Sequence, residues 1–370
     1  MRDHGTVGRL AIALWLALLA SCGEGSPKAP PTLARRGTAT NPRAVLRRVE
    51  RDAGAEAPDG PRITGFLGRD ETSFLASLRS EDVAHVELGR GGRSLAFRVT
   101  LADGRRAYFK PEQSFSAARW YSEVAAYHLD RELGFGRTPP VVSRRFYWPP
   151  LRRVAGDDAR LAEVRVENHS VRGALIGWIE GRVPPLGLGR SWERWIRLEG
   201  PLAISPYQRP SDYRGLLNQR LTPEETEIGR LEEQDRPLTD ARAGELSDLI
   251  VFDYLISNVD RWGGGFTNLR TCGGGGPLVF LDNGAGFWTG SHRLGLMDAR
   301  LEALQRFRRR TIEALERFEL AAFSERLAAD PNSPLLTERQ IEGVEVRRRA
   351  VLAHVMRLRR RFGDRIWVQE

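Results

Sequence analysis

The chain has almost no lysine and almost no cysteine. Of its 57 lysine and arginine residues only two are lysine, Lys28 and Lys110. The cysteines are also two, Cys22 and Cys272, so disulfides can add little stability and a hydrophobic core must hold the fold. The apolar run at residues 10–20 is too short to cross a bilayer, which needs about 20 residues. With 370 residues, the chain can build a core in one bilobal domain or two small ones.

The short apolar run is typical of an export signal. It follows the positive charges of Arg2 and Arg9 and ends in small residues. Its end, Leu-Ala-Ser-Cys22, resembles the lipobox of bacterial lipoproteins, in which the cysteine is diacylated and becomes the first residue of the mature chain. We therefore expect a signal peptide at residues 1–21 and a lipid anchor at Cys22, since two acyl chains bind a membrane firmly. The expected location is the cell envelope, at the outer membrane or the periplasmic face, and Cys272 is left without a disulfide partner. The alternative is an ordinary secretory signal that happens to end in cysteine.

Composition and periodicity divide the rest of the chain into three parts. Residues 22–60 are rich in Pro, Ala, Gly and Arg, which predicts a flexible tether. Residues 62–180 are expected to form a β-rich lobe and residues 181–370 a mostly helical lobe, so the predicted fold class is α+β and bilobal. Within the first lobe, a hairpin is expected at 95–111 and a helix at 116–133. The other expected elements are extended stretches at 141–148, 174–179 and 278–281 and helices at 245–257, 301–327 and 338–362.

Three arginine clusters lie in the helical-looking segments near the C-terminus. They are residues 308–310, 347–349 and 359–361. Solvated helix faces are the favoured interpretation, and contact with anionic lipid is the alternative for a membrane-tethered basic protein. No nucleic-acid-binding motif accompanies the charge, so no nucleic-acid partner is expected.

Lys110 is the only lysine of the predicted folded region. Because arginine stands in almost every other basic position, Lys110 is a candidate for a compact point charge, such as one that holds a phosphate. Glu123 lies in the next predicted helix, and a strand lysine paired with a glutamate of the following helix positions phosphates in protein kinases. Upstream, Gly91 and Gly92 belong to a glycine-rich run that can close over phosphates. The alternatives are chance survival of one lysine and an ordinary turn.

Two aspartates follow apolar elements in the second half of the chain. Asp260 comes after a predicted helix and Asp282 after a predicted strand, so both carboxylates can face one cleft. There, one can orient a hydroxyl or accept its proton, and the other can hold a divalent metal on nucleotide phosphates. Asn268, between them, is a candidate second metal ligand. A helix cap and an Asp-Asn-Gly turn are the structural alternatives, but the combination with Lys110 and Glu123 upstream favours a catalytic site.

These motifs together resemble the Four-jointed and Golgi secreted-kinase family. The resemblance covers roughly residues 89–287, and it is carried by residues 108–111, 123–131, 133–135, 138–144, 252–261 and 279–287. It implies an atypical protein-kinase-like fold that transfers the γ-phosphate of ATP, with Mn²⁺ or Mg²⁺, to Ser or Thr of exported proteins.

The resemblance also implies a role for each matching residue. Lys110 would hold the α- and β-phosphates, together with its partner Glu123. Asp260 would be the catalytic aspartate, Asp282 the metal ligand, and residues 173–180 the connection between the lobes on the adenine side.

The chain departs from the family pattern in two respects. Asn268 is displaced from the usual spacing after the catalytic aspartate, and the cysteines that staple animal relatives are absent. Two other functions therefore stay open. One is a lipid or small-metabolite kinase of phosphoinositide-kinase-like type, which shares the Asn-x-Asp-Arg loop and the Asp-Asn-Gly turn. The other is a catalytically silent kinase-fold binding lipoprotein, since the bacterial envelope is a poor source of ATP.

Overall fold

The computed structural model describes most of the expected folded part of the chain. The described residues are 65–188, 192–199, 206–207, 238–262, 266–290 and 294–369. The expected signal peptide, Cys22 and the tether lie outside them. Within these ranges, no helix combines the length and the apolar character that a membrane span requires.

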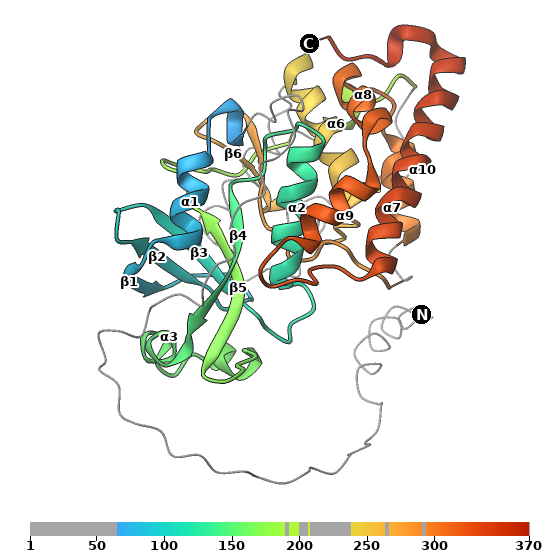
Figure 1. The fold of residues 1–370 in the computed structure, drawn as a ribbon. Coiled ribbons are helices and arrows are strands. Elements are labelled where there is room, and N and C mark those ends of the chain that lie inside the picture. Colours follow the sequence, from blue (N-terminus) through green and yellow to red (C-terminus); the bar gives the residue numbers. More distant parts are fainter. Residues whose placement is uncertain are drawn as a thin grey trace, which may run out of the picture. The chain divides into compact units, whose positions relative to one another are not determined.

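An antiparallel five-stranded sheet forms the first half of the described fold (Figure 1). Its strand order is β1-β2-β3-β5-β4, and the strands are β1 Val83–Leu88, β2 Phe97–Leu101, β3 Arg106–Pro111, β4 Val141–Tyr147 and β5 Ser170–Gly177. The predicted hairpin is confirmed, because β2 pairs with β3 across a turn in which Gly104 has a φ of +83°. Phe97 and Phe109 lie opposite each other and are both fully buried, so one face of the hairpin belongs to the core of the sheet.

Helix α2 connects the sheet to the rest of the molecule. It runs over Trp120–Glu132, inside the predicted range, and contacts β4, β5 and α9. Figure 1 shows α2 between the sheet and the later helices, which explains why it is buried on nearly all sides. The first half also contains short elements that the sequence patterns did not predict, namely α1 Thr72–Ser80, α3 Trp148–Ala155 and the 3-10 helices η2 Phe66–Gly68 and η3 Ala159–Glu163.

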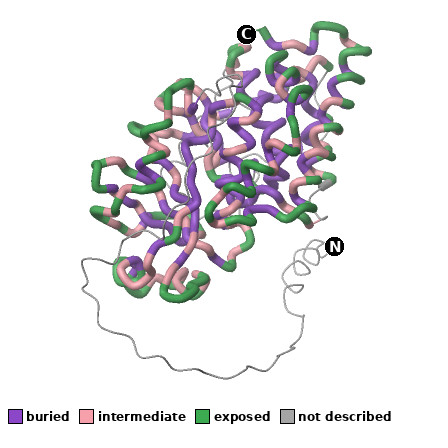
Figure 2. Tube along the Cα trace, viewed as in Figure 1, coloured by how far each residue is buried: buried purple, intermediate pink, exposed green. Residues whose placement is uncertain are grey.

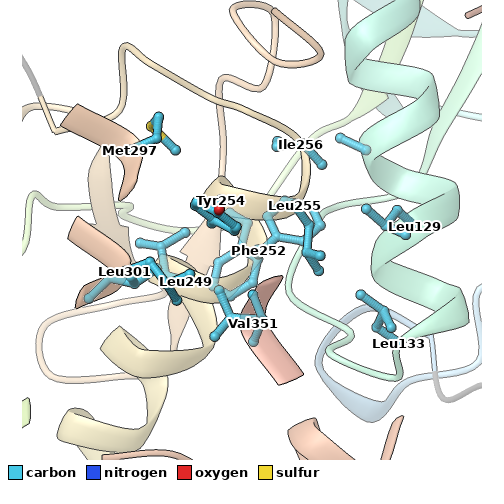
Figure 3. Packing of buried hydrophobic residues seen from close by; sticks show 14 of the residues in the cluster. Leu129, Leu133, Leu249, Phe252, Tyr254, Leu255, Ile256, Met297, Leu301 and Val351 are labelled. Carbon is cyan, nitrogen blue, oxygen red and sulfur yellow. The ribbon is translucent and has the colours of Figure 1, made fainter. Parts of the chain in front are cut away.

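Helices dominate the described segments after residue 180. They are η4 Trp192–Ile196, α6 Asp240–Leu255, α7 Leu294–Ala303, α8 Arg309–Arg317, α9 Leu320–Ala328, α10 Glu338–Phe362 and η7 Gly363–Ile366, with a small hairpin of β6 Leu269–Thr271 and β7 Leu278–Phe280. Helix α6 is the centre of this half. Figure 3 shows its Leu249, Phe252 and Leu255 beside Leu129 of α2 and Val351 of α10. The same hydrophobic core therefore joins α2 to the helical half, and Figure 2 shows the burial continuing through both.

The single helix predicted over residues 301–327 is wrong. The chain forms α7, α8 and α9 instead, with extended backbone between them. The backbone N–H of Gln305 donates to the carbonyl of Ile196 at 2.8 Å, and that of Phe307 donates to the carbonyl of Ile366 at 2.7 Å. These bonds to distant segments replace helical bonds, which local periodicity cannot reveal.

The arginine clusters are only partly solvated helix faces. Arg308 is 6% exposed and donates from Nη1 to Asp248 at 2.6 Å. Arg347 and Arg348 donate to the backbone carbonyls of Leu255 and Leu315 at 2.7 and 2.8 Å. Several of these arginines therefore tie helices together, because a guanidinium can satisfy carbonyls that a helix end leaves unpaired.

Candidate active site

A cleft of about 550 Å³ brings the predicted site residues together. Its lining includes four parts of the chain that are distant in sequence. They are the glycine turn (residues 90–94), Tyr108 and Lys110 on β3, residues 176–179 at the end of β5, and a group formed by Asp260, Asn268 and Asp282. The sheet supplies the first three parts and the helical half supplies the last. Every predicted site residue of the described chain lines this cleft except Glu123, which is buried directly behind Lys110.

Lys110 joins the two predicted carboxylates. Its Nζ donates to Glu123 Oε1 and to Asp282 Oδ1, each at 2.6 Å. The side chain of Glu123 is 3% exposed, whereas that of Asp282 is 46% exposed toward solvent. Burial disfavours the charged ammonium, but the two carboxylates outweigh burial and raise the pKa of Lys110. The charge of Lys110 in turn lowers the pKa of Asp282, so both groups are ionised at neutral pH.

Close packing between α2 and the turn after β7 holds Glu123 in place. The second oxygen of Glu123, Oε2, accepts the backbone N–H of Asn283 at 3.0 Å. Ser122 Oγ donates to the carbonyl of Gly286 at 3.1 Å. A Cβ at Gly284 would lie 2.9 Å from the carbonyl oxygen of Ala117, so only glycine fits where the turn passes the start of α2. The Lys110–Glu123 pair is therefore built into the contact between the two halves.

A buried arginine positions the loop that carries Asp260. Arg261 is fully buried, and its Nε donates to Asp253 of α6 at 2.8 Å. Its Nη2 donates to Asn283 Oδ1 at 2.5 Å, and its Nη1 donates to the carbonyl of Leu281. One guanidinium thus links α6 to both aspartate motifs, while the neighbouring Asp260 is exposed in the cleft.

Sequence reasoning did not single out Asp253. The available signal was a carboxylate inside an otherwise apolar helical run, because a buried charge requires a partner. Burial raises the pKa of Asp253, and the charge of Arg261 opposes that change. Trp262 Nε1 also donates to this carboxylate, at 2.9 Å, so Asp253 is fully engaged in holding the loop.

Asp282 and Asn268 are suitable ligands for a divalent cation. The Nδ2 of Asn268 donates to Asp282 Oδ2 at 3.1 Å, so the amide and the carboxylate lie side by side in the lining of the cleft. Carboxylate and amide oxygens suit Mg²⁺ and Mn²⁺. The described ranges contain no group of three acidic, histidine or cysteine side chains that would hold a metal by itself. The donor set therefore fits a cation that shares its ligands with nucleotide phosphates.

The end of β5 forms one wall of the cleft, within the predicted connection at 173–180. Residues 176–179 line the cleft, whereas 173–175 do not, and residues 173–177 all belong to β5. A Cβ at Gly177 would lie 2.3 Å from the ring of Phe74, so any larger residue at this position would clash with that ring. The glycine turn also lines the cleft, and its Gly91 and Gly92 have φ values of +78° and +76°.

Comparison with known proteins finds several similar proteins. A family model described as "Golgi casein kinase, C-terminal, Fam20" matches residues 205–365. Extracellular serine/threonine protein kinase FAM20C of Homo sapiens is 27% identical over 325 residues, which are 76% of this chain and 53% of that protein. Four-jointed box protein 1 of Homo sapiens is 30% identical over 283 residues, 67% of this chain and 54% of that protein. Glycosaminoglycan xylosylkinase of Homo sapiens is 25% identical over 331 residues, 84% of this chain and 80% of that protein. The chain thus spans about half the length of the first two.

Solved structures share the fold. The structure of hydra Fam20 with sugar has a TM-score of 0.60 at 21% identity, covering 83% of this chain and 95% of that chain. The Golgi casein kinase with Mn/ADP bound has a TM-score of 0.54 at 20% identity, covering 81% and 79%. The chain is therefore a relative of the Four-jointed and Golgi secreted-kinase family and has its atypical protein-kinase-like fold, as the motifs indicated.

Proposed function

We propose that this protein is an ATP-dependent kinase that transfers the γ-phosphate to a hydroxyl group. The observation that carries the proposal is the link from Lys110 to both Glu123 and Asp282, in a cleft that Asp260 and the glycine turn also line. Lysine, glutamate and two aspartates in this arrangement are the parts that phosphoryl transfer uses in kinases. A structural ion pair would not require Asp260 and Asn268 at the same cleft.

Each residue has a distinct task in this proposal. The ammonium of Lys110 binds phosphate oxygens, and Glu123 keeps it directed into the cleft. The exposed carboxylate of Asp260 accepts a hydrogen bond from the acceptor hydroxyl. It then takes the proton of this hydroxyl as the γ-phosphate is transferred to the hydroxyl oxygen and ADP leaves. A divalent cation, held by Asp282 and Asn268, supplies neutralisation of phosphate charge when it is bound.

We place the acceptor among Ser and Thr hydroxyls of exported proteins. The match to an extracellular serine/threonine protein kinase over 76% of this chain supports this choice. A sugar hydroxyl is the second candidate, because the chain covers 80% of a glycosaminoglycan xylosylkinase but 53% of the protein kinase. Transfer of labelled phosphate to casein, to a xylose-containing glycan and to phosphoinositide vesicles separates these acceptors from a lipid kinase. Transfer to none of them would leave a silent binding protein.

Nucleotide binding is the first test of the site. A soluble form beginning at Gly23 retains every described residue, and we expect ATP with Mn²⁺ to raise its Tm by several degrees. A ligand at 100 times its Kd stabilises a protein by about 2.7 kcal/mol. Asp282→Ala should abolish the metal-dependent part of this shift, whereas Asp157→Ala, at an exposed site outside the cleft, should keep it. The absence of any shift with every nucleotide and metal in the wild type would overturn the kinase proposal.

We also propose that the protein is anchored in the cell envelope through a lipid on Cys22. The support is the N-terminal sequence, in which a short apolar run ends at this cysteine. We expect the full chain expressed in a bacterium to incorporate labelled palmitate and to fractionate with membranes. Cys22→Ser should lose both properties, and Cys272→Ser should retain both. Labelling that persists in Cys22→Ser would contradict the assignment.

A further inference from the structure

One arginine outside the predicted motifs holds the glycine turn. Arg160 belongs to η3, about 70 residues after the turn in the sequence. Its Nη1 lies 3.3 Å from the carbonyl oxygen of Gly91, 3.2 Å from that of Gly92 and 3.1 Å from that of Ser94. A single cationic nitrogen thus gathers three carbonyl oxygens of the turn, which would otherwise repel one another.

Arg160 is itself fixed by a neighbouring carboxylate. Asp158 accepts the N–H of Nε at 2.9 Å and that of Nη2 at 2.6 Å, so its two carboxylate oxygens hold one edge of the guanidinium. The same carboxylate caps η3 by accepting the backbone N–H of Arg160 at 2.9 Å. The hydrogen bonds from Arg160 lower the pKa of Asp158 to about 2, so the pair is ionised throughout the physiological range.

A second contact attaches the turn to η3. Arg93 Nη1 donates to Glu163 at 2.9 Å, and the Arg93 guanidinium lies 4.4 Å from the ring centre of Phe115. Glu163 is anchored in turn, because its carbonyl accepts the N–H of Ser114 at 2.8 Å. The exit of the turn is pinned through the N–H of Leu95, which donates to a glutamine side chain at 2.6 Å. The 3-10 helix η3 therefore holds the turn in place through Arg160 and Glu163.

The bonding of the turn is one-sided. Its carbonyl oxygens are taken by Arg160, whereas its N–H groups from Gly91 to Ser94 have no acceptor among the described residues. Consecutive N–H groups in a turn with positive φ values form concave sites that bind anions. The turn lines the same cleft as Lys110, whose ammonium adds one full positive charge to attract a phosphate chain.

We propose that Arg160 is a positioning residue that pre-forms the glycine turn for the phosphates of the nucleotide. By collecting the carbonyl oxygens, it leaves the N–H groups available to phosphate oxygens and lowers the ordering cost of binding. This inference rests on the proposed kinase function. It adds a residue that strengthens binding of the phosphate chain but not of the nucleoside.

The test compares Arg160→Met with the wild type, using calorimetry with ATP, ADP and adenosine and hydrogen exchange at the N–H of Leu95, which is hydrogen-bonded at the exit of the turn. Methionine keeps an apolar stem and removes the guanidinium. We expect the Kd for ATP to rise about tenfold or more, since bonds to a charged group are among the stronger ones, while the Kd for adenosine stays nearly unchanged. Exchange at Leu95 should become faster without nucleotide, because a less ordered turn breaks this hydrogen bond more often. Arg160→Lys should recover part of the ATP affinity, because an ammonium keeps the charge but loses the bidentate contact with Asp158.

Arg152→Met is the matched control, since Arg152 lies on the neighbouring α3 and, among the described residues, donates only to the carbonyl of Gly156, at 2.6 Å, outside the turn. Its ATP affinity should equal that of the wild type. Unchanged ATP affinity and unchanged exchange in Arg160→Met would overturn the inference, and so would equal losses of ATP and adenosine binding, which indicate general damage. If the wild type binds no nucleotide, the kinase proposal fails, while the exchange measurement still decides whether Arg160 orders the turn.

Discussion

Replacing Asp260 by asparagine is expected to reduce kcat by about 10²- to 10⁴-fold, the usual contribution of a positioned general base. Asparagine keeps the size of the side chain and removes the carboxylate that would accept the hydroxyl proton. The backbone of the loop should stay in place, because Asn258 accepts the N–H of residue 260 at 3.2 Å and the neighbouring Arg261 remains buried. Steady-state phosphate transfer measures the loss, and calorimetry with ATP and Mn²⁺ should show nearly unchanged nucleotide affinity.

The control for this variant is Asp157→Asn, which removes an exposed carboxylate outside the cleft and should leave kcat unchanged. Full activity in Asp260→Asn would show that another group takes the proton. A parallel loss of nucleotide affinity would show that Asp260 supports the nucleotide site and not the acceptor.

Replacing Arg261 by methionine is expected to lower the free energy of unfolding by about 3–5 kcal/mol, the cost of leaving a buried carboxylate without its partner. Asp253 would remain buried and would keep the hydrogen bond from Trp262 Nε1, but it would lose the charge of Arg261. The carbonyl of Leu281 and the side-chain oxygen of Asn283 would each lose the donor that Arg261 supplies. Chemical denaturation measures the change. Phosphate transfer should fall as well, because Arg261 ties the loop of Asp260 to the turn of Asp282.

Two variants make this prediction specific. Arg349→Met removes an arginine whose side chain is 75% exposed, and it should change stability by less than about 1 kcal/mol. Arg261→Met combined with Asp253→Leu removes both charges, and it should cost less than the sum of the single changes, because neither charge is left unpaired. Additive losses would show that Arg261 and Asp253 do not stabilise each other.

Local patterns were sufficient for several elements of the fold. Helix α10 has the predicted bounds, since Thr337 and Gln340 form a capping box at its start and Gly363 follows its end with a φ of +60°. The β2–β3 hairpin is as predicted, because alternation and an Asp-Gly turn are both short-range signals. The same patterns failed at 301–327, where helical periodicity continues but the backbone of Gln305 and Phe307 bonds to other segments.

The chemistry of the site was also readable where composition made a residue conspicuous. Lys110 stands out in a chain that otherwise uses arginine, and its spacing to Glu123 indicated the pair that the structure places at 2.6 Å. The two aspartate motifs indicated a shared cleft because each follows an apolar element, and Asp260 and Asp282 do line one cleft.

By itself, then, the sequence determined the amphipathic elements, the lysine–glutamate pair and the two aspartate motifs, because each depends on neighbouring residues or on an unusual residue type. Only the tertiary structure decided that Asp282 also binds Lys110, that Asp253 and Arg261 hold the loop of Asp260, and that Arg160 holds the glycine turn. Those contacts depend on how α2, α6 and η3 pack against the rest of the fold. In an arginine-rich chain, no local signal distinguishes Arg160, the arginine that packing brings to three carbonyl oxygens.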